Sequence, residues 1–194
     1  MSVNLIQTKD LKKYFKTPKG DLHAVDNVNF TIKKGQTLGV VGESGCGKST
    51  LGRTILRLLE PTGGEVLYNG KNILNYNFKE MQEMRKKMQI IFQDPYASLN
   101  PRMTISQIIA EPIKVCKKIT NKVEIDNKIF DLMETVGLAE RLVNTYPHEL
   151  DGGRRQRIGI ARALALDPEF RVCDEPVSAL DVSIQAQILN LMMD

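Results

Sequence analysis

Two hydrophobic periods alternate along the chain, one typical of strands and one typical of helices. In residues 3–33, apolar and polar residues alternate in short runs on both sides of a basic turn, FKTPKGD. This pattern predicts short strands separated by that turn. The apolar run 38–42 predicts a buried strand. Apolar residues at helical spacing over 48–61 predict a helix that stops at Pro61.

The remainder of the chain continues this alternation. An Asn-Gly pair at 69–70 predicts the turn of a β-hairpin. The other expected elements are a polar helix over 78–87, a strand over 88–92, helical structure from 104 to 145, a helix over 154–166, a strand over 170–176 and a last helix over 183–194. This order of elements predicts an α/β layered fold.

The composition is that of an ordinary globular protein. The chain has 194 residues, 42% of them hydrophobic and 26% charged, and a net charge of +4. This length predicts one domain, or one domain with an embedded subdomain. The mildly basic balance does not indicate a nucleic-acid partner. The sequence shows neither an apolar run near the ~20 residues of a membrane span nor a signal-peptide core, so we expect the chain to stay in the cytosol.

The segment GESGCGKST, Gly42 to Thr50, fits the phosphate-loop pattern G-x-x-x-x-G-K-[ST] between an expected strand and an expected helix. Its glycines let several N–H groups point at one anion, and the helix N-terminus adds partial positive charge. Lys48 is placed to reach the β- and γ-phosphates and Ser49 to ligate Mg²⁺. The alternative is a Gly-rich turn that only caps a helix. The expected nucleotide-binding residues are Gly42, Ser44, Gly45, Cys46, Gly47, Lys48, Ser49 and Thr50.

An acidic pair in VCDEP follows the strand expected at 170–176. We expect Asp174 to hold Mg²⁺, directly or through water, and Glu175 to polarise an attacking water. Alone, such a pair could be a surface turn. Together with a phosphate loop, it is typical of phosphoryl transfer, which needs little more than positioning and charge neutralisation.

These motifs, in this order, resemble the ATPase subunits of ABC transporters. IIFQDP resembles the Q-loop, with Gln93 near Mg²⁺ and the attacking water, and SALD, which ends at Asp181, resembles the D-loop. LDGGRRQR stands where the family has its LSGGQ signature. Phe15 falls where the family stacks an aromatic ring on adenine, and Tyr14 is the less favoured choice. The signature residues expected to contact nucleotide are Asp151, Gly152, Gly153 and Arg154.

The resemblance implies an α/β fold with a P-loop NTPase core of the ABC ATPase type. We expect residues 1–94 to form the N-terminal antiparallel β part and the phosphate-loop core. VCDEP resembles the family's Walker B strand. Residues 95–153 would form an inserted helical subdomain with the signature, and residues 154–194 a truncated Walker B half of the core.

Two longer segments narrow the resemblance to importers of oligopeptides, dipeptides or nickel. These are QDPYASLNPRMTISQII and CDEPVSALDVSIQAQILNL, and the second resembles the second of that group's paired ATPases. The implied cofactors are ATP and Mg²⁺. The implied partners are a second ATPase subunit, in a heterodimer or homodimer, two transmembrane permeases and, indirectly, an extracytoplasmic solute-binding protein. The implied location is the cytoplasmic face of a bacterial or archaeal plasma membrane.

Two residues depart from the family pattern. Asp151 replaces the signature serine and either faces the neighbouring subunit's γ-phosphate, which would repel it, or caps its own helix, where Asp is as good as Ser. We favour a working signature. Arg171 interrupts a strand expected to be buried on both faces. It either snorkels from the start of the strand or reflects a sequence error or genetic decay.

The chain stops at Asp194, whereas the family continues with another core strand and a switch histidine. In the family that strand lies between the phosphate-loop strand and the Walker B strand. We therefore expect a fragment of a longer gene product with poor hydrolysis of its own. The alternative functions are a degenerate or truncated nucleotide-binding module without robust hydrolysis, and a soluble ABC ATPase outside transport.

Overall fold

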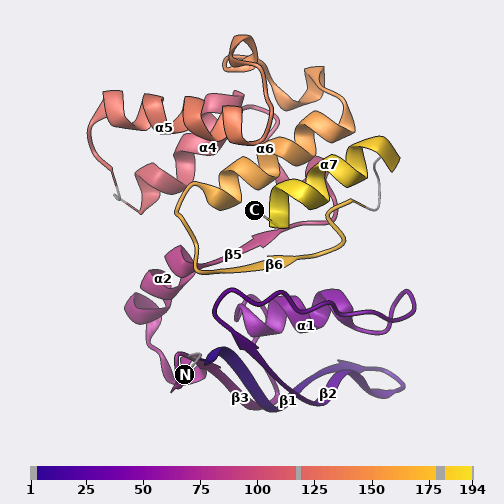
Figure 1. Cartoon of the computed structure of the whole chain (residues 1–194). Coiled ribbons are helices and arrows are strands. Elements are labelled where there is room, and N and C mark those ends of the chain that lie inside the picture. Colours follow the sequence, from indigo (N-terminus) through magenta and orange to yellow (C-terminus); the bar gives the residue numbers. More distant parts are fainter. Residues whose placement is uncertain (1–3, 117–118, 178–181, 194) are drawn as a thin grey trace. The chain divides into compact units, whose positions relative to one another are not determined.

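The computed structural model describes residues 4–116, 119–177 and 182–193 (Figure 1). The chain divides into two compact units, Met1–Arg85 and Lys86–Asp194, and each is described by itself. This division differs from the three parts expected from the sequence. The strand before Gln93 belongs to the second unit because it pairs with the strand before Asp174.

The described part of the first unit contains a four-stranded antiparallel sheet in the order β2-β1-β3-β4. Its strands are β1 (Asn4–Thr17), β2 (Gly20–Lys33), β3 (Gly63–Tyr68) and β4 (Lys71–Asn72). Its helices are α1 (Lys48–Ile55), the short 3₁₀ helix η1 (Ile73–Asn75) and α2 (Phe78–Lys87), which ends just past the division. The turn predicted at 69–70 is confirmed, with φ of 47° at Asn69 and 78° at Gly70, as a type I′ turn requires.

The prediction of a buried strand over 38–42 is wrong. The described residues 36–43 contain no strand, and Leu38, Val40 and Val41 are exposed, Val41 to 92%. Strand formation depends on packing and on a paired neighbour more than on intrinsic preference. No strand of the described sheets pairs with this segment.

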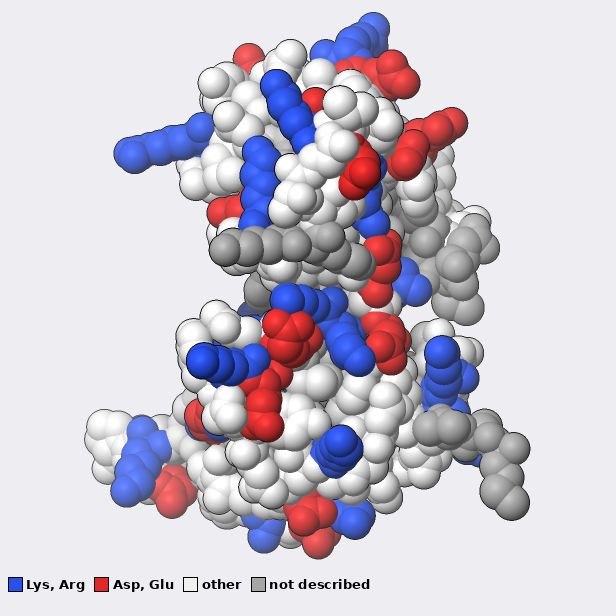
Figure 2. All heavy atoms as spheres, turned by 90° about the vertical axis from the view of Figure 1, so that its left-hand side faces the viewer, with Lys and Arg blue, Asp and Glu red and all other residues white. Residues whose placement is uncertain are grey.

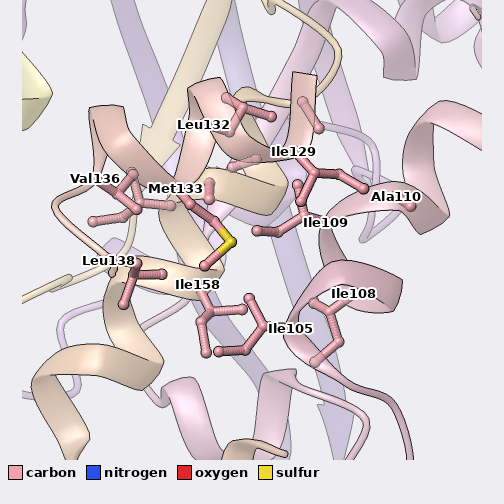
Figure 3. Close-up of a cluster of buried hydrophobic side chains, with 14 of the residues drawn as sticks. Ile105, Ile108, Ile109, Ala110, Ile129, Leu132, Met133, Val136, Leu138 and Ile158 are labelled. Carbon is pink, nitrogen blue, oxygen red and sulfur yellow. The ribbon is translucent and has the colours of Figure 1, made fainter. Parts of the chain in front are cut away.

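The second unit contains the parallel pair β5 (Met88–Ile91) and β6 (Phe170–Cys173), in register from Met88 opposite Phe170 to Ile91 opposite Cys173. Its helices are α3 (Pro95–Ser98), α4 (Ile105–Val115), α5 (Lys122–Thr135), α6 (Gly152–Leu164) and α7 (Val182–Met193), with the 3₁₀ helices η2 (Glu140–Leu142) and η3 (Pro147–Glu149). Helices α4, α5 and α6 enclose an apolar core in which Ile109, Met133 and Ile158 are almost fully buried (Figure 3).

Arg171 lies on β6 and is exposed, as is Cys173, while Phe170 is buried. The expectation of a strand buried on both faces is therefore wrong for the described structure. Among the described strands only β5 pairs with β6, so the guanidinium reaches water and needs no buried partner.

Charged side chains of both signs are distributed over the surface. On the face shown in Figure 2, Lys and Arg are interspersed with Asp and Glu and form no continuous basic stripe. Within the described ranges, none of the helices combines the length and the apolar character needed to cross a membrane.

Candidate functional site

The phosphate loop is exposed from Gly42 to Cys46 and ends in helix α1. The Lys48 ammonium folds back over the loop, and its Nζ donates to the carbonyl oxygens of Gly42 and Glu43, both at 2.9 Å. The N–H of Cys46 donates to the Glu43 carbonyl at 3.3 Å and so tightens the turn. These contacts hold the ammonium on the loop backbone at the N-terminus of a helix, an arrangement that suits a phosphate group.

Two glycines give the loop its shape, and they do so for different reasons. Gly45 has φ of 81° with open space around it, whereas Gly47, the N-cap of α1, has φ of 98°. A Cβ on Gly47 would stand 2.1 Å from the carbonyl oxygen of Ala24. Gly47 is therefore required both by its backbone conformation and by the close approach of β2.

The approach of β2 is set by a bulge in the β1–β2 hairpin. Lys13 pairs with Val25 and Tyr14 with His23, so Ala24 has no partner in the register. This bulge places the Ala24 carbonyl against Gly47 of the phosphate loop.

Tyr14, His23 and Asp26 form a polar aromatic cluster in this hairpin. The Tyr14 and His23 rings stack at 3.8 Å with 8° between their planes, and the Tyr14 hydroxyl donates to Asp26 Oδ1. This hydrogen bond raises the pKa of Tyr14 above its ordinary value and holds the pKa of Asp26 below its own. His23 and Asp26 were not predicted from the sequence because the bulge, which no sequence signal marks, decides which residues face Tyr14.

Phe15, the residue expected to stack on adenine, is half-buried and lies opposite Leu22 in the hairpin register. The Lys13 Nζ stands 4.9 Å from its ring centroid. Because the Tyr14 ring is already stacked on His23, Phe15 is the better candidate for a base, and the sequence resemblance favours the same residue.

Gln93 and Glu175 are brought together in the second unit. They follow β5 and β6, whose carboxyl ends share one edge because the strands are parallel. Gln93 Nε2 donates to Glu175 Oε2 at 2.9 Å, although the residues are 82 positions apart. The N–H of Asp174 donates to the Ile91 carbonyl at 2.9 Å, and Asp174 is only 6% exposed. Glu175 has φ of 45°, an uncommon value for a residue with a side chain that is often found at functional sites.

Asp151 caps its own helix. It is the N-cap of α6, and its Oδ1 accepts a hydrogen bond from the N–H of Arg154 at 2.8 Å. Its Oδ2 lies 3.4 Å from Arg154 Nη1. Of the two orientations left open by the sequence, the structure has the capping one, with Gly152 and Gly153 in the first turn.

Two groups of expected site residues remain. Asp181 and the rest of the segment SALD lie outside the described residues. Ser49 lies in the first turn of α1 and Asp174 directly after β6, each in its own unit. Magnesium bound with nucleotide phosphates needs only one or two protein oxygens, and a hydroxyl and a carboxylate are suitable donors.

The loop with Lys48 at the start of a helix is typical of phosphate-loop nucleotide-binding proteins, and so is an amide–carboxylate pair after two parallel strands. The sequence profile of the ABC transporter family matches residues 25–178 of the chain. The chain therefore belongs to the ABC transporter family.

Curated relatives are similar over almost the whole chain. The oligopeptide transport ATP-binding protein OppF of Bacillus subtilis is 58% identical, with 100% of this chain and 64% of the relative covered. AppF, an oligopeptide transport ATP-binding protein of the same organism, is 52% identical, with 97% and 59% covered. OppF of Haemophilus influenzae is 54% identical, with 94% and 55% covered. The chain spans less than two thirds of the length of each relative.

Solved structures show the same fold. The ATP-binding cassette MJ0796, in a dimeric post-hydrolysis state bound to ADP and Pi, has a TM-score of 0.89 at 30% identity, with 97% of this chain and 81% of that one covered. The cbiO1 protein from Clostridium perfringens, part of an ABC transporter complex, has a TM-score of 0.82 at 27% identity, with 98% and 72% covered. The fold class predicted from the sequence is confirmed.

Proposed function

We propose that the protein binds and hydrolyses ATP and thereby energises an ABC importer of peptides. The observation that carries the proposal is the 2.9 Å hydrogen bond between Gln93 and Glu175 at the ends of β5 and β6. A carboxylate held by an amide is suited to polarise a water molecule that the amide helps to orient. The oligopeptide transport names of the relatives support the peptide class of cargo, and nickel is the other cargo that the sequence resemblance allows.

The phosphate loop supplies the binding half of this chemistry. The Lys48 ammonium would exchange its two carbonyl partners for β- and γ-phosphate oxygens, and the loop N–H groups would donate to the same phosphates. Ser49 and Asp174 would hold Mg²⁺, directly or through water, and Mg²⁺ would neutralise charge on the phosphates. Phe15 would stack on the adenine ring.

The proposed assembly is a sandwich of two ATPase subunits, in which the Asp151–Arg154 signature reads the partner's ATP. The dimeric state of the related cassette MJ0796 supports this part of the proposal. The further partners are two transmembrane permeases and, indirectly, an extracytoplasmic solute-binding protein, with the chain peripheral at the cytoplasmic face of the membrane of a bacterium or archaeon. The face shown in Figure 2 carries both signs of charge and no continuous basic stripe of the kind that binds nucleic acid.

Binding of ATP tests the proposal directly. Lys48→Ala removes a charge-assisted contact, a type of bond that contributes about 1.5–3 kcal/mol, so ATP affinity should fall about 10- to 100-fold. Lys34→Ala removes an exposed lysine of the turn after β2 and serves as the matched control, with unchanged affinity. Equal affinity of the parent and Lys48→Ala would contradict the proposal, as would a parent that binds no ATP.

A non-hydrolysing nucleotide-binding module is the second candidate, and one observation favours it. The apolar segment before the phosphate loop, with Leu38, Val40 and Val41, is exposed and pairs with no described strand. Tight ATP binding by the parent without turnover, in the presence of Mg²⁺, would select this module over the ATPase.

A further inference from the structure

Helix α6 contacts the segment that carries Gln93 at three points along its length. Gln156 Nε2 lies 3.5 Å from the carbonyl oxygen of Phe92, just before Gln93. The Arg155 guanidinium stands over the Tyr96 ring, 4.5 Å from its centroid, in the helix that follows Gln93. About two turns further along α6 than Arg155, Arg162 Nη1 donates to the carbonyl of Ser98.

Two of these α6 side chains, Arg155 and Gln156, are themselves held in place. Gln156 is only 1% exposed, so its amide is held inside the unit. Arg155 Nε donates to the Pro147 carbonyl at 2.7 Å, which leaves its guanidinium plane oriented toward Tyr96. A guanidinium that is already bonded loses little further freedom when it stacks on a ring.

The segment 92–98 has little support from regular structure of its own. Helix α3 is a single turn capped by Asp94, whose Oδ1 accepts from the N–H groups of Tyr96 and Ala97. Tyr96 is 63% exposed, so burial of its ring does not hold the segment in place. The contacts with α6 therefore restrain the residues on both sides of Gln93.

We propose that α6, through Arg155, Gln156 and Arg162, is the positioning element for Gln93. The inference rests on the proposed function, because it assigns these side chains to the orientation of the Gln93 amide against Glu175. They are positioning residues and touch neither the nucleotide nor the reacting atoms. The same helix begins at the Asp151 cap, so the signature turn and the support of Gln93 belong to one element.

The first test measures the restraint without nucleotide. NMR-detected amide exchange of residues 96 and 97, corrected for intrinsic rates, is compared in the parent, Arg155→Lys, Tyr96→Ala and Tyr96→Phe. Lysine keeps the charge but loses the planar stack, so Arg155→Lys and Tyr96→Ala should exchange about threefold faster, the size of an exposed cation–π contact. Tyr96→Phe keeps a ring and should match the parent.

A matched control and a double variant sharpen this test. Arg141→Lys makes the same substitution at an exposed arginine of η2 and should leave exchange unchanged. Combining Arg155→Lys with Tyr96→Ala should give no faster exchange than the faster single variant, because both remove one contact. Unchanged exchange in both single variants, or additive effects in the double variant, would overturn the proposal.

The second test is ATP turnover by the same variants. Arg155→Lys and Tyr96→Ala should lower kcat severalfold and leave KM for ATP unchanged, because the nucleotide is held by the 42–50 loop. Tyr96→Phe should restore kcat. A raised KM with unchanged kcat would overturn the positioning role. If the parent shows no turnover, the proposed function fails, and the exchange result alone decides whether α6 restrains the segment.

Discussion

Substitution of Asp151 tests whether the signature aspartate serves its own helix. Asp151→Ala removes the hydrogen bond to the Arg154 N–H and the 3.4 Å contact with the Arg154 guanidinium. Loss of an N-cap costs about 1 kcal/mol, and a half-exposed ion pair adds at most about 0.5 kcal/mol. The free energy of unfolding should therefore fall by about 1–1.5 kcal/mol in Asp151→Ala. Asp151→Ser keeps a capping oxygen and should lose less than about 0.5 kcal/mol.

Urea unfolding followed by circular dichroism measures both changes. With a slope of about 2 kcal/mol per molar, the urea midpoint should fall by roughly 0.5–0.75 M in Asp151→Ala and by less than about 0.3 M in Asp151→Ser. ATP-dependent dimerisation should be the same in Asp151→Ser and the parent, because the carboxylate is engaged with its own helix. Equal destabilisation by Ser and Ala, or a large gain of dimerisation in Asp151→Ser, would refute the reasoning.

Three further predictions concern the loop, the hairpin and the core. Gly47→Ala should abolish ATP binding in a titration, because the added Cβ would meet the backbone of β2 at 2.1 Å. Gly45→Ala has open space around the added Cβ and should show only the strain of positive φ, about 1–2 kcal/mol. Equal losses of ATP affinity in the two variants would contradict this. Asp26→Asn should lower the pKa of Tyr14, as measured in an absorbance titration, and an unchanged pKa of Tyr14 would speak against the Tyr14–Asp26 hydrogen bond. In the parent, the stabilisation by ionised Asp26 should be fully present above the ordinary carboxyl pKa. It should be lost as the pH falls through the lowered pKa of Asp26 in the folded protein. Ile109→Ala should lower the free energy of unfolding by about 2–5 kcal/mol in urea, and a loss below about 1 kcal/mol would show a looser core.

Local sequence signals predicted much of the fold. The Asn69–Gly70 pair gave the correct hairpin because its backbone conformation is decided by two residues. The strands before Gln93 and Asp174 were also expected, and their parallel pairing makes the contact between Gln93 and Glu175. The family resemblance assigned both residues to one site, and the structure supplies their hydrogen bond.

Features that depend on distant neighbours were not predicted. The apolar residues Val40 and Val41 have strand preference, yet they form no strand, because such preference acts only where a neighbour pairs. Arg171 was expected to interrupt a strand buried on both faces, yet its side chain is exposed. The bulge at Ala24, which decides the contact with Gly47, depends on hairpin register and leaves no mark in the sequence.

The measurement that tests the central claim most directly compares ATP binding and ATP turnover in Glu175→Gln and the parent. Glutamine keeps the shape of the side chain and removes the carboxylate that Gln93 holds at 2.9 Å. Affinity for ATP should stay within about threefold, because binding depends on the phosphate loop, while turnover should fall at least about 100-fold, within the range for loss of a positioned base. Unchanged turnover in Glu175→Gln would contradict the assignment of Glu175 as the residue that activates water.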